Sequence, residues 1–198
     1  MIEHRDDLGA KMGMWLFIFT ELLLFGMLFL VYAVYRSMHP EAFKLAGEEL
    51  DVALGTLNTV ILLISSMTVA MSISAIQKGN KNLALALLGV TIFIAVVFLV
   101  NKYFEWGVKF EYGFQPGGAE LLELGQGTIL FFGLYFIMTG IHALHILIGI
   151  GLFIYVYWQV KIDKIHQTDY VWLENTGLYW HLVDLIWIFL FPLFYLIH

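Results

Sequence analysis

Five long runs of mostly apolar residues dominate this sequence, at residues 12–35, 56–77, 83–104, 128–158 and 177–197. A helix needs about 20 such residues to cross the hydrocarbon of a membrane. Because lipid offers the backbone no hydrogen-bond partners, a crossing segment satisfies its own amide groups as a helix. The sequence therefore predicts an all-α polytopic membrane protein, a bundle of five transmembrane helices that form one domain over residues 1–198.

The composition excludes several classes of protein. Hydrophobic residues make up 61% of the chain and charged residues 13%, whereas soluble proteins contain roughly 45–50% apolar and about 25% charged residues. The chain contains no cysteine, which excludes disulfides, cysteine-ligated iron–sulfur clusters and cysteine-based copper sites. The formal charge of -6 is spread without a basic stripe, so nucleic acid is not an expected partner.

The basic residues near the ends of the runs predict the orientation. If the N-terminus is cytoplasmic, the basic residues divide into a larger inner set and a smaller outer set. The inner set is Arg5, Lys11, Lys78, Lys81, Lys161 and Lys164, and the outer set is Arg36, Lys44, Lys102 and Lys109. Because basic residues favour the cytoplasmic side, we expect a cytoplasmic N-terminus and a C-terminus outside. No small-residue cleavage pattern follows the first run, so we expect it to be a retained helix and not a signal peptide.

Glu21 interrupts the first run and is the first candidate for a functional residue. It lies about 14 Å along a helix from Met12, near the middle of the bilayer. Ionisable groups at this depth are costly, so we expect a proton or a histidine of another helix as its companion. Two interpretations stay open: a proton-active or coupling carboxyl, or a protonated structural acid bonded across a helix interface.

Two further pairs of polar residues lie within the runs at a spacing of three. His142 and His145 occupy one face of the fourth run, and His181 and Asp184 repeat the spacing in the fifth. The histidine pair could hold a metal together with a carboxylate, but neighbours on one helix cannot be opposite axial ligands of a haem. We favour hydrogen-bonded structural or lipid-facing histidines and expect no metal in this chain. For His181 and Asp184, an Asp–His hydrogen bond or a shared polar face that anchors lipid is geometrically available.

The remaining polar residues of the runs are expected to join helices. We assign this role to Asn58, Thr59, Ser65 and Ser66 of the second run. Most tryptophans and phenylalanines would pack in the bundle or lie at the membrane interface. The sequence contains no nucleophile elbow, phosphate-binding loop or dinucleotide fingerprint.

Five segments, in order, resemble the hallmark segments of subunit III of haem-copper oxidases, the cytochrome c oxidase family. They are Gly13-Met-Trp-Leu-Phe-Ile-Phe-Thr-Glu21, Leu57-Asn-Thr-Val-Ile-Leu-Leu-Ile-Ser-Ser66, Tyr103-Phe-Glu-Trp106, Thr139-Gly-Ile-His-Ala-Leu-His145 and Tyr179-Trp-His-Leu-Val-Asp-Leu-Ile-Trp187. Together they cover nearly the whole chain.

This resemblance implies an accessory subunit with no redox or catalytic centre of its own. It would pack beside subunit I, where haems and copper reduce oxygen and pump protons, and it would bind structural phospholipid and help to sustain proton uptake and the lifetime of subunit I. Subunit II, small subunits and a respiratory supercomplex are further implied partners. The implied location is the bacterial cytoplasmic (inner) membrane.

The resemblance also implies roles for single residues. Glu21 matches the intramembrane glutamate of the family, and His142 and His145 match its paired histidines. Glu174, Trp180 and His181 match its residues at the start of the last helix. With Asp184, these residues are our candidates for lipid binding or proton coupling.

Many members of this family have seven helices, and this chain resembles the shorter form that begins at their third. Five-helix forms resemble subunits of quinol oxidases, of some bacterial cytochrome c oxidases and of nitric-oxide-reductase accessory proteins, so the electron donor stays open. One wall of the family's lipid cleft would then come from another chain.

Two alternatives of other classes remain. One is a small proton-coupled transporter in which Glu21 and the histidines form a relay, although the sequence has no clear inverted repeat. The other is a metalloenzyme with His142, His145 and Glu21 or His181 as ligands.

Overall fold

The computed structural model describes residues 7–196 except 116, 119, 120 and 122. The elements in this part of the chain are α1 (Asp7–Met38), α2 (Pro40–Glu48), α3 (Val52–Gln77), α4 (Lys81–Glu111), α6 (Gln126–Lys161), α7 (Val171–Phe191) and the π-helical turn η1 (Pro192–Leu196). The helices α1, α3, α4, α6 and α7 with η1 are long and apolar enough to cross a membrane. The predicted all-α architecture with five spans is thus confirmed, and the orientation of the termini stays a prediction.

The helices extend beyond the apolar runs that predicted them. Helix α1 begins at Asp7, α4 continues to Glu111 and α7 begins at Val171. Polar residues can continue a helix where it leaves the hydrocarbon, because the backbone bonds do not depend on apolar side chains. The start of α3 is fixed by Asp51, whose side chain accepts hydrogen bonds from two backbone amides of the first turn.

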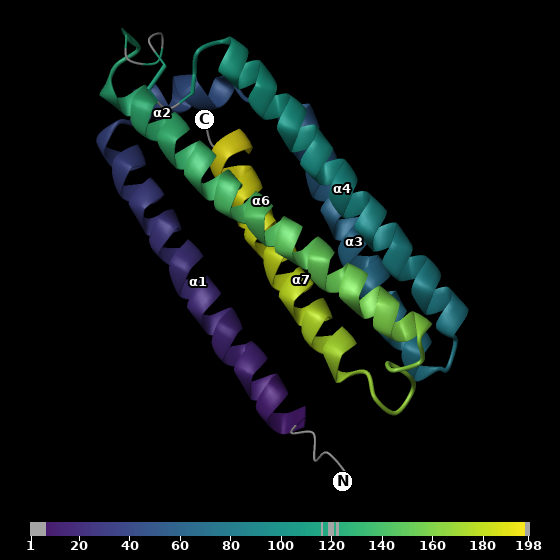
Figure 1. Ribbon diagram of the computed structural model, residues 1–198. Helices are drawn as coiled ribbons and strands as arrows, with labels where there is room; N and C mark the ends of the chain where they lie inside the picture. Colours follow the sequence, from purple (N-terminus) through teal and green to yellow (C-terminus); the bar gives the residue numbers. More distant parts are fainter. Residues whose placement is uncertain (1–6, 116, 119–120, 122, 197–198) are drawn as a thin grey trace.

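Helix α7 is the centre of the bundle (Figure 1). It packs against α6, α3 and α1, while α3 and α4 form an antiparallel hairpin on one side. The short α2 crosses near the end of the bundle where the C-terminal turn lies, and it packs on α6. Among the five spanning helices, α7 is the most buried and α1 the least.

Glycine permits a close contact between two helices in the core. A Cβ atom at Gly149 of α6 would lie 2.6 Å from the indole ring of Trp180 on α7. A real side chain cannot approach a rigid ring so closely, so α6 and α7 need glycine at this level. Small residues serve the same purpose in other membrane bundles, where close packing drives helix association.

Polar contacts join α1 to the bundle at three depths. They are Lys11 with Glu174 at 2.9 Å, Glu21 with His145 at 2.9 Å, and the Tyr32 hydroxyl donating to the Leu193 carbonyl at 2.6 Å. These ties lie near the first end, the middle and the last end of α1. The least buried helix is therefore held along its whole length.

Candidate functional site

Glu21 and His145 form the polar contact at the middle of the membrane domain. Glu21 Oε2 of α1 lies 2.9 Å from His145 Nε2 of α6, and the two side chains are only 16% and 12% exposed. The other ring nitrogen, Nδ1, lies 2.8 Å from the carbonyl oxygen of Ile141. The structure therefore brings Glu21 to a histidine of another helix, as expected.

Aromatic rings pack against the His145 side of this pair. Phe25 meets the His145 ring edge-on at a centroid distance of 5.6 Å, and Tyr179 stacks on its face at 6.4 Å. The Tyr179 hydroxyl also donates to the backbone carbonyl of His145 at 2.8 Å. Since both the ring and its backbone are held, His145 has little freedom to turn.

His142 lies apart from this pair although it is only one turn away. Its ring is fully buried, stacks on Trp187 at 5.2 Å and meets the edge of Phe98 at 5.8 Å. Within the described part of the chain, neither of its ring nitrogens has a hydrogen-bond partner. The two histidines of one helix face thus contact different neighbours, because a spacing of three residues leaves an angle of about 60° between them around the helix.

His181 and Asp184 do not bond to each other. His181 Nδ1 lies 2.6 Å from the Ser66 hydroxyl of α3. Asp184 is buried, and neither of its oxygens has a hydrogen-bond partner among the described residues, although the Ser66 hydroxyl lies nearby. The Asp–His bond that the spacing allowed is thus replaced by a contact between helices.

Side chains of α3 bond to two neighbouring helices at successive levels. The four polar residues that were expected to join helices make these contacts: Asn58 with Asn101 at 2.9 Å, Thr59 with Trp187 at 3.0 Å, Ser65 with Trp180 at 2.9 Å and Ser66 with His181. Three of the four reach α7, the central helix. This arrangement gives hydroxyl and amide groups partners that lipid cannot supply.

A cavity of about 370 Å³ opens beside the first turns of α1 and α7. Its lining consists of Lys11, Trp15, Ile73, Glu174, Asn175, Leu178 and His181. Lys11 and Glu174 form an ion pair there, with Nζ and Oε2 2.9 Å apart. The lining thus combines this ion pair with apolar and polar side chains, and it includes two of our candidates, Glu174 and His181.

A buried charge cluster at the other end of the bundle was missed from the sequence. Lys102 Nζ donates to Glu105 at 3.1 Å and to the hydroxyls of Tyr135 and Tyr195, each at 3.0 Å. Both hydroxyls in turn donate to Glu105. The i, i+3 spacing of Lys102 and Glu105 was the available signal, but the two tyrosines are distant in sequence.

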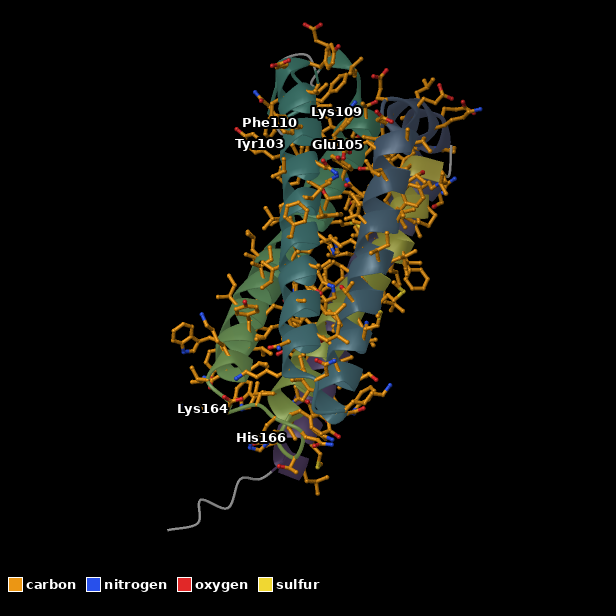
Figure 2. All side chains as sticks on the ribbon, turned by 90° about the vertical axis from the view of Figure 1, so that its right-hand side faces the viewer. Tyr103, Glu105, Lys109, Phe110, Lys164 and His166 are labelled. Atoms are coloured by element: carbon orange, nitrogen blue, oxygen red, sulfur yellow. The ribbon has the colours of Figure 1, made fainter. Side chains whose placement is uncertain are left out.

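Lys102 and Lys109, which the sequence analysis placed in the outer set of basic residues near the ends of the runs, do not lie in a loop. Both belong to α4 and are buried, and Lys109 donates to the carbonyl oxygen of Glu49. Figure 2 shows Glu105 and Lys109 near one end of the molecule, opposite Lys164 and His166. Burial is possible because each ammonium group has acceptors within the fold.

Among the described residues, no group of three or more histidine, aspartate or glutamate side chains is placed to hold a metal ion. Glu21 is bonded to His145, while His142 is packed between aromatic rings. The ligand set of the metalloenzyme alternative is therefore not assembled in this part of the chain.

Comparisons with known proteins agree with this architecture. The family model for cytochrome c oxidase subunit III matches residues 4–198. The chain is 33% identical to cytochrome c oxidase subunit 3 of Thermostichus vulcanus, over 98% of this chain and 90% of that protein. It is 30% identical to a probable quinol oxidase subunit 3 of Staphylococcus haemolyticus, over 98% and 91%.

A third relative joins two subunits in one polypeptide. The heme-copper oxidase subunit I+III of Aeropyrum pernix is 30% identical over 99% of this chain and 24% of that protein. The family match covers all five helices that can span a membrane. This chain is thus an integral membrane protein that belongs to the cytochrome c oxidase subunit III family, the third subunit of haem-copper oxidases.

Proposed function

We propose that this chain is the accessory subunit of a proton-pumping haem-copper terminal oxidase in aerobic respiration. It would stabilise subunit I, which carries the haems and copper, and support proton uptake there without a redox or catalytic centre of its own. The observation that carries this proposal is the family match over residues 4–198. We place the complex in the bacterial cytoplasmic membrane, together with subunit II, small subunits and a respiratory supercomplex.

Direct packing on subunit I is supported by the relative from Aeropyrum pernix, whose name describes subunits I and III in one chain. Covalent fusion keeps two domains close to each other, which favours a permanent contact between them. In the present chain, α1 is the least buried spanning helix and has most of its apolar side chains exposed. It therefore offers a large surface for either lipid or another membrane subunit.

We assign structural phospholipid to the cavity beside the first turns of α1 and α7. The ion pair of Lys11 and Glu174 matches a zwitterionic headgroup, with its phosphate beside the lysine and its amine beside the glutamate. Trp15, Ile73 and Leu178 line the same cavity and would contact the acyl chains. A lipid here would fill the space between α1, α3 and α7 and stiffen their packing.

The electron donor would be either cytochrome c or quinol. Relatives with names of both kinds match this chain at 33% and 30% identity. Subunit III would contribute no electron-transfer group, so both donors are compatible with the same fold. A role as an accessory protein of a nitric oxide reductase is the alternative within this class.

The proposal is tested by purifying the oxidase with and without this chain from its native membrane. We expect the complex without it to start with normal spectra but to lose turnover and proton uptake during continued catalysis. Re-addition of the chain before turnover should restore the lifetime. Full and durable turnover and pumping without the chain would refute the proposal.

A further inference from the structure

A second cavity, of about 400 Å³, lies where the last turns of α4 meet the start of α3. We call it the α3–α4 cavity. Figure 2 labels two of its lining residues, Glu105 and Lys109, near one end of the molecule. This is the end opposite the cavity of Lys11 and Glu174. Its volume is within the range of small-ligand pockets.

Lys109 contributes unused hydrogen-bond donors to this cavity. The residue is 7% exposed, and its ammonium group donates to the backbone carbonyl of Glu49. The ring of Phe114 lies 5.9 Å from Nζ. Among the described residues, Nζ bonds to no second acceptor and no carboxylate forms an ion pair with it. An ammonium group carries three donors, so a ligand in the cavity can supply the acceptors that a buried donor needs.

The charge around Lys109 decides which kind of acceptor fits. Three carboxylates, Glu49, Asp51 and Glu105, line the cavity with it, and Lys102 offsets the charge of Glu105. Two carboxylates therefore face one ammonium group, so the wall is negative. A phosphate would be repelled there, and an amine alone would leave the donors of Lys109 unpaired. A hydroxyl group both donates and accepts, so it can bond to carboxylate and ammonium without adding charge.

The apolar part of the lining lies beside the surface that would face lipid. It consists of Leu54, Phe104 and Val108, and the last two are exposed on the spanning helix α4. Acyl chains can lie along these side chains while a headgroup enters the cavity. The exposed ring of Tyr112 completes the lining, and an aromatic ring can pack on the apolar face of a sugar ring.

We infer that the α3–α4 cavity binds a lipid with an uncharged, polyhydroxylated headgroup, such as a glycosyl diacylglycerol. Its hydroxyl groups donate to the carboxylates of Glu49 and Asp51 and accept from Lys109, while its acyl chains lie along Phe104 and Val108. Glu49 ends α2 and Asp51 begins α3, so the lipid joins these two helices to α4. This site goes beyond the proposed function, which places a phospholipid at the opposite end.

The first test compares lipids on the purified complex that contains the full chain. The complex is purified in a detergent without a sugar headgroup, because an alkyl glycoside would compete for the site. Native mass spectrometry then follows the binding of monogalactosyl diacylglycerol, phosphatidylethanolamine and phosphatidylglycerol with the same acyl chains. At the α3–α4 cavity we expect the glycolipid to bind about tenfold more tightly than either phospholipid, which corresponds to one net hydrogen bond.

Two pairs of variants assign the binding to this cavity. Val108→Trp fills it, whereas Val100→Trp adds the same bulk on α4 outside its lining, at a position that is 46% exposed against 47% for Val108. Glu49→Gln removes a carboxylate and keeps the backbone carbonyl that binds Lys109, and Glu48→Gln, at an exposed neighbouring position, is its control.

We expect Val108→Trp to abolish the preference for the glycolipid. Glu49→Gln should weaken glycolipid binding, because a hydrogen bond to a carboxylate is stronger than one to an amide. It should also raise the binding of phosphatidylglycerol, since the repulsion of the phosphate falls. Val100→Trp and Glu48→Gln should bind like the wild type.

Two results would overturn the inference. One is a phospholipid that binds as tightly as the glycolipid and is lost in Val108→Trp. The other is glycolipid binding that Val108→Trp and Val100→Trp reduce equally.

A second measurement covers the case in which Val108→Trp fails to assemble. Dodecyl maltoside presents hydroxyl groups on a single chain, so it should displace the glycolipid from the wild-type complex. A zwitterionic detergent of the same chain length should not. Equal displacement by the two detergents would contradict an uncharged, polyhydroxylated specificity.

Discussion

At the scale of single residues, Lys102 stands out because burying its charge has a large desolvation cost. Its side chain is buried and forms an ion pair with Glu105. The hydroxyls of Tyr135 and Tyr195 each accept a hydrogen bond from the lysine and donate one to the glutamate. The ammonium group of Lys102 thus donates three hydrogen bonds and the carboxylate of Glu105 accepts three, so both charges have polar partners. Removing one partner of such a pair is costly because it leaves the other charge buried and unpaired.

We therefore predict that Lys102→Met lowers the stability of the subunit by about 3–5 kcal/mol. The double variant Lys102→Met, Glu105→Gln should be less damaged than Lys102→Met alone, because it leaves no uncompensated charge. The measurement is unfolding of the subunit in mild detergent against increasing SDS. Equal stability of Lys102→Met and the wild type would show that the cluster is not a closed charge pair.

Gly149 gives a second residue-scale prediction. A methyl group there would overlap the ring of Trp180, whose indole nitrogen is also bonded to Ser65, so the ring cannot move freely. Gly149→Ala should cost about 1–3 kcal/mol through overpacking. Gly151→Ala is the matched control, since no atom lies within 4 Å of its Cβ position. The comparison uses the same SDS unfolding assay, and similar losses for both variants would contradict the packing argument.

At the scale of elements, α1 is the helix that depends most on individual polar contacts. Helices in lipid gain little from the hydrophobic effect when they associate, so packing and hydrogen bonds hold them together. Helix α1 buries the least surface of the five spanning helices, and its ties lie at Lys11, Glu21 and Tyr32. Each tie should therefore affect the position of this helix measurably.

The tie at Tyr32 can be removed with little change in shape. Tyr32→Phe loses the hydroxyl that donates to the Leu193 carbonyl in η1, which should cost about 0.5–1.5 kcal/mol. We expect faster hydrogen exchange in η1 and at the last turn of α1, measured by mass spectrometry. Tyr35→Phe is the control, because the Tyr35 hydroxyl makes no hydrogen bond within the described part of the chain. Equal exchange in the two variants would show that η1 does not depend on this bond.

At the scale of the whole molecule, the two ends of the bundle differ in chemistry. One end carries the buried cluster around Lys102, and the other carries the cavity with the ion pair of Lys11 and Glu174. The charges of the buried cluster are satisfied by its own members, although Glu105 also lines a cavity of about 400 Å³ at that end. The cavity at the Lys11 end combines the ion pair with the apolar Trp15, Ile73 and Leu178, a combination that suits a phospholipid.

We predict that the double variant Lys11→Gln, Glu174→Gln loses bound phospholipid from the purified oxidase. Both charged groups that match a zwitterionic headgroup would be gone, while Glu174→Gln keeps the side-chain length and Lys11→Gln shortens the side chain by one atom. Native mass spectrometry should then count fewer retained lipids than in the wild type. Lys44→Gln, an exposed change on α2, is the control for loss of surface charge. An unchanged lipid count in the double variant would remove the cavity as a lipid site.

The sequence predicted many residues of the candidate site. It did not predict which of these side chains bond to each other. An acid in the middle of an apolar run implies a partner, so a histidine near Glu21 was expected before the structure identified His145. The hydrogen bonds from α3 to α7 depend on how each helix is rotated about its own axis. An apolar run with scattered polar residues does not fix that rotation. The same limit explains why a bond between His181 and Asp184 looked available and does not form.

The sequence by itself determined the number and kind of the elements, because hydrocarbon thickness and the need to satisfy the backbone leave a membrane-spanning segment few alternatives. Tertiary structure alone decided which polar groups meet. Tyr135 and Tyr195, which bond to Lys102, are 33 and 93 residues away from it in the sequence. Local patterns cannot encode such contacts, since they arise only when the rotation and depth of every helix are set together by packing.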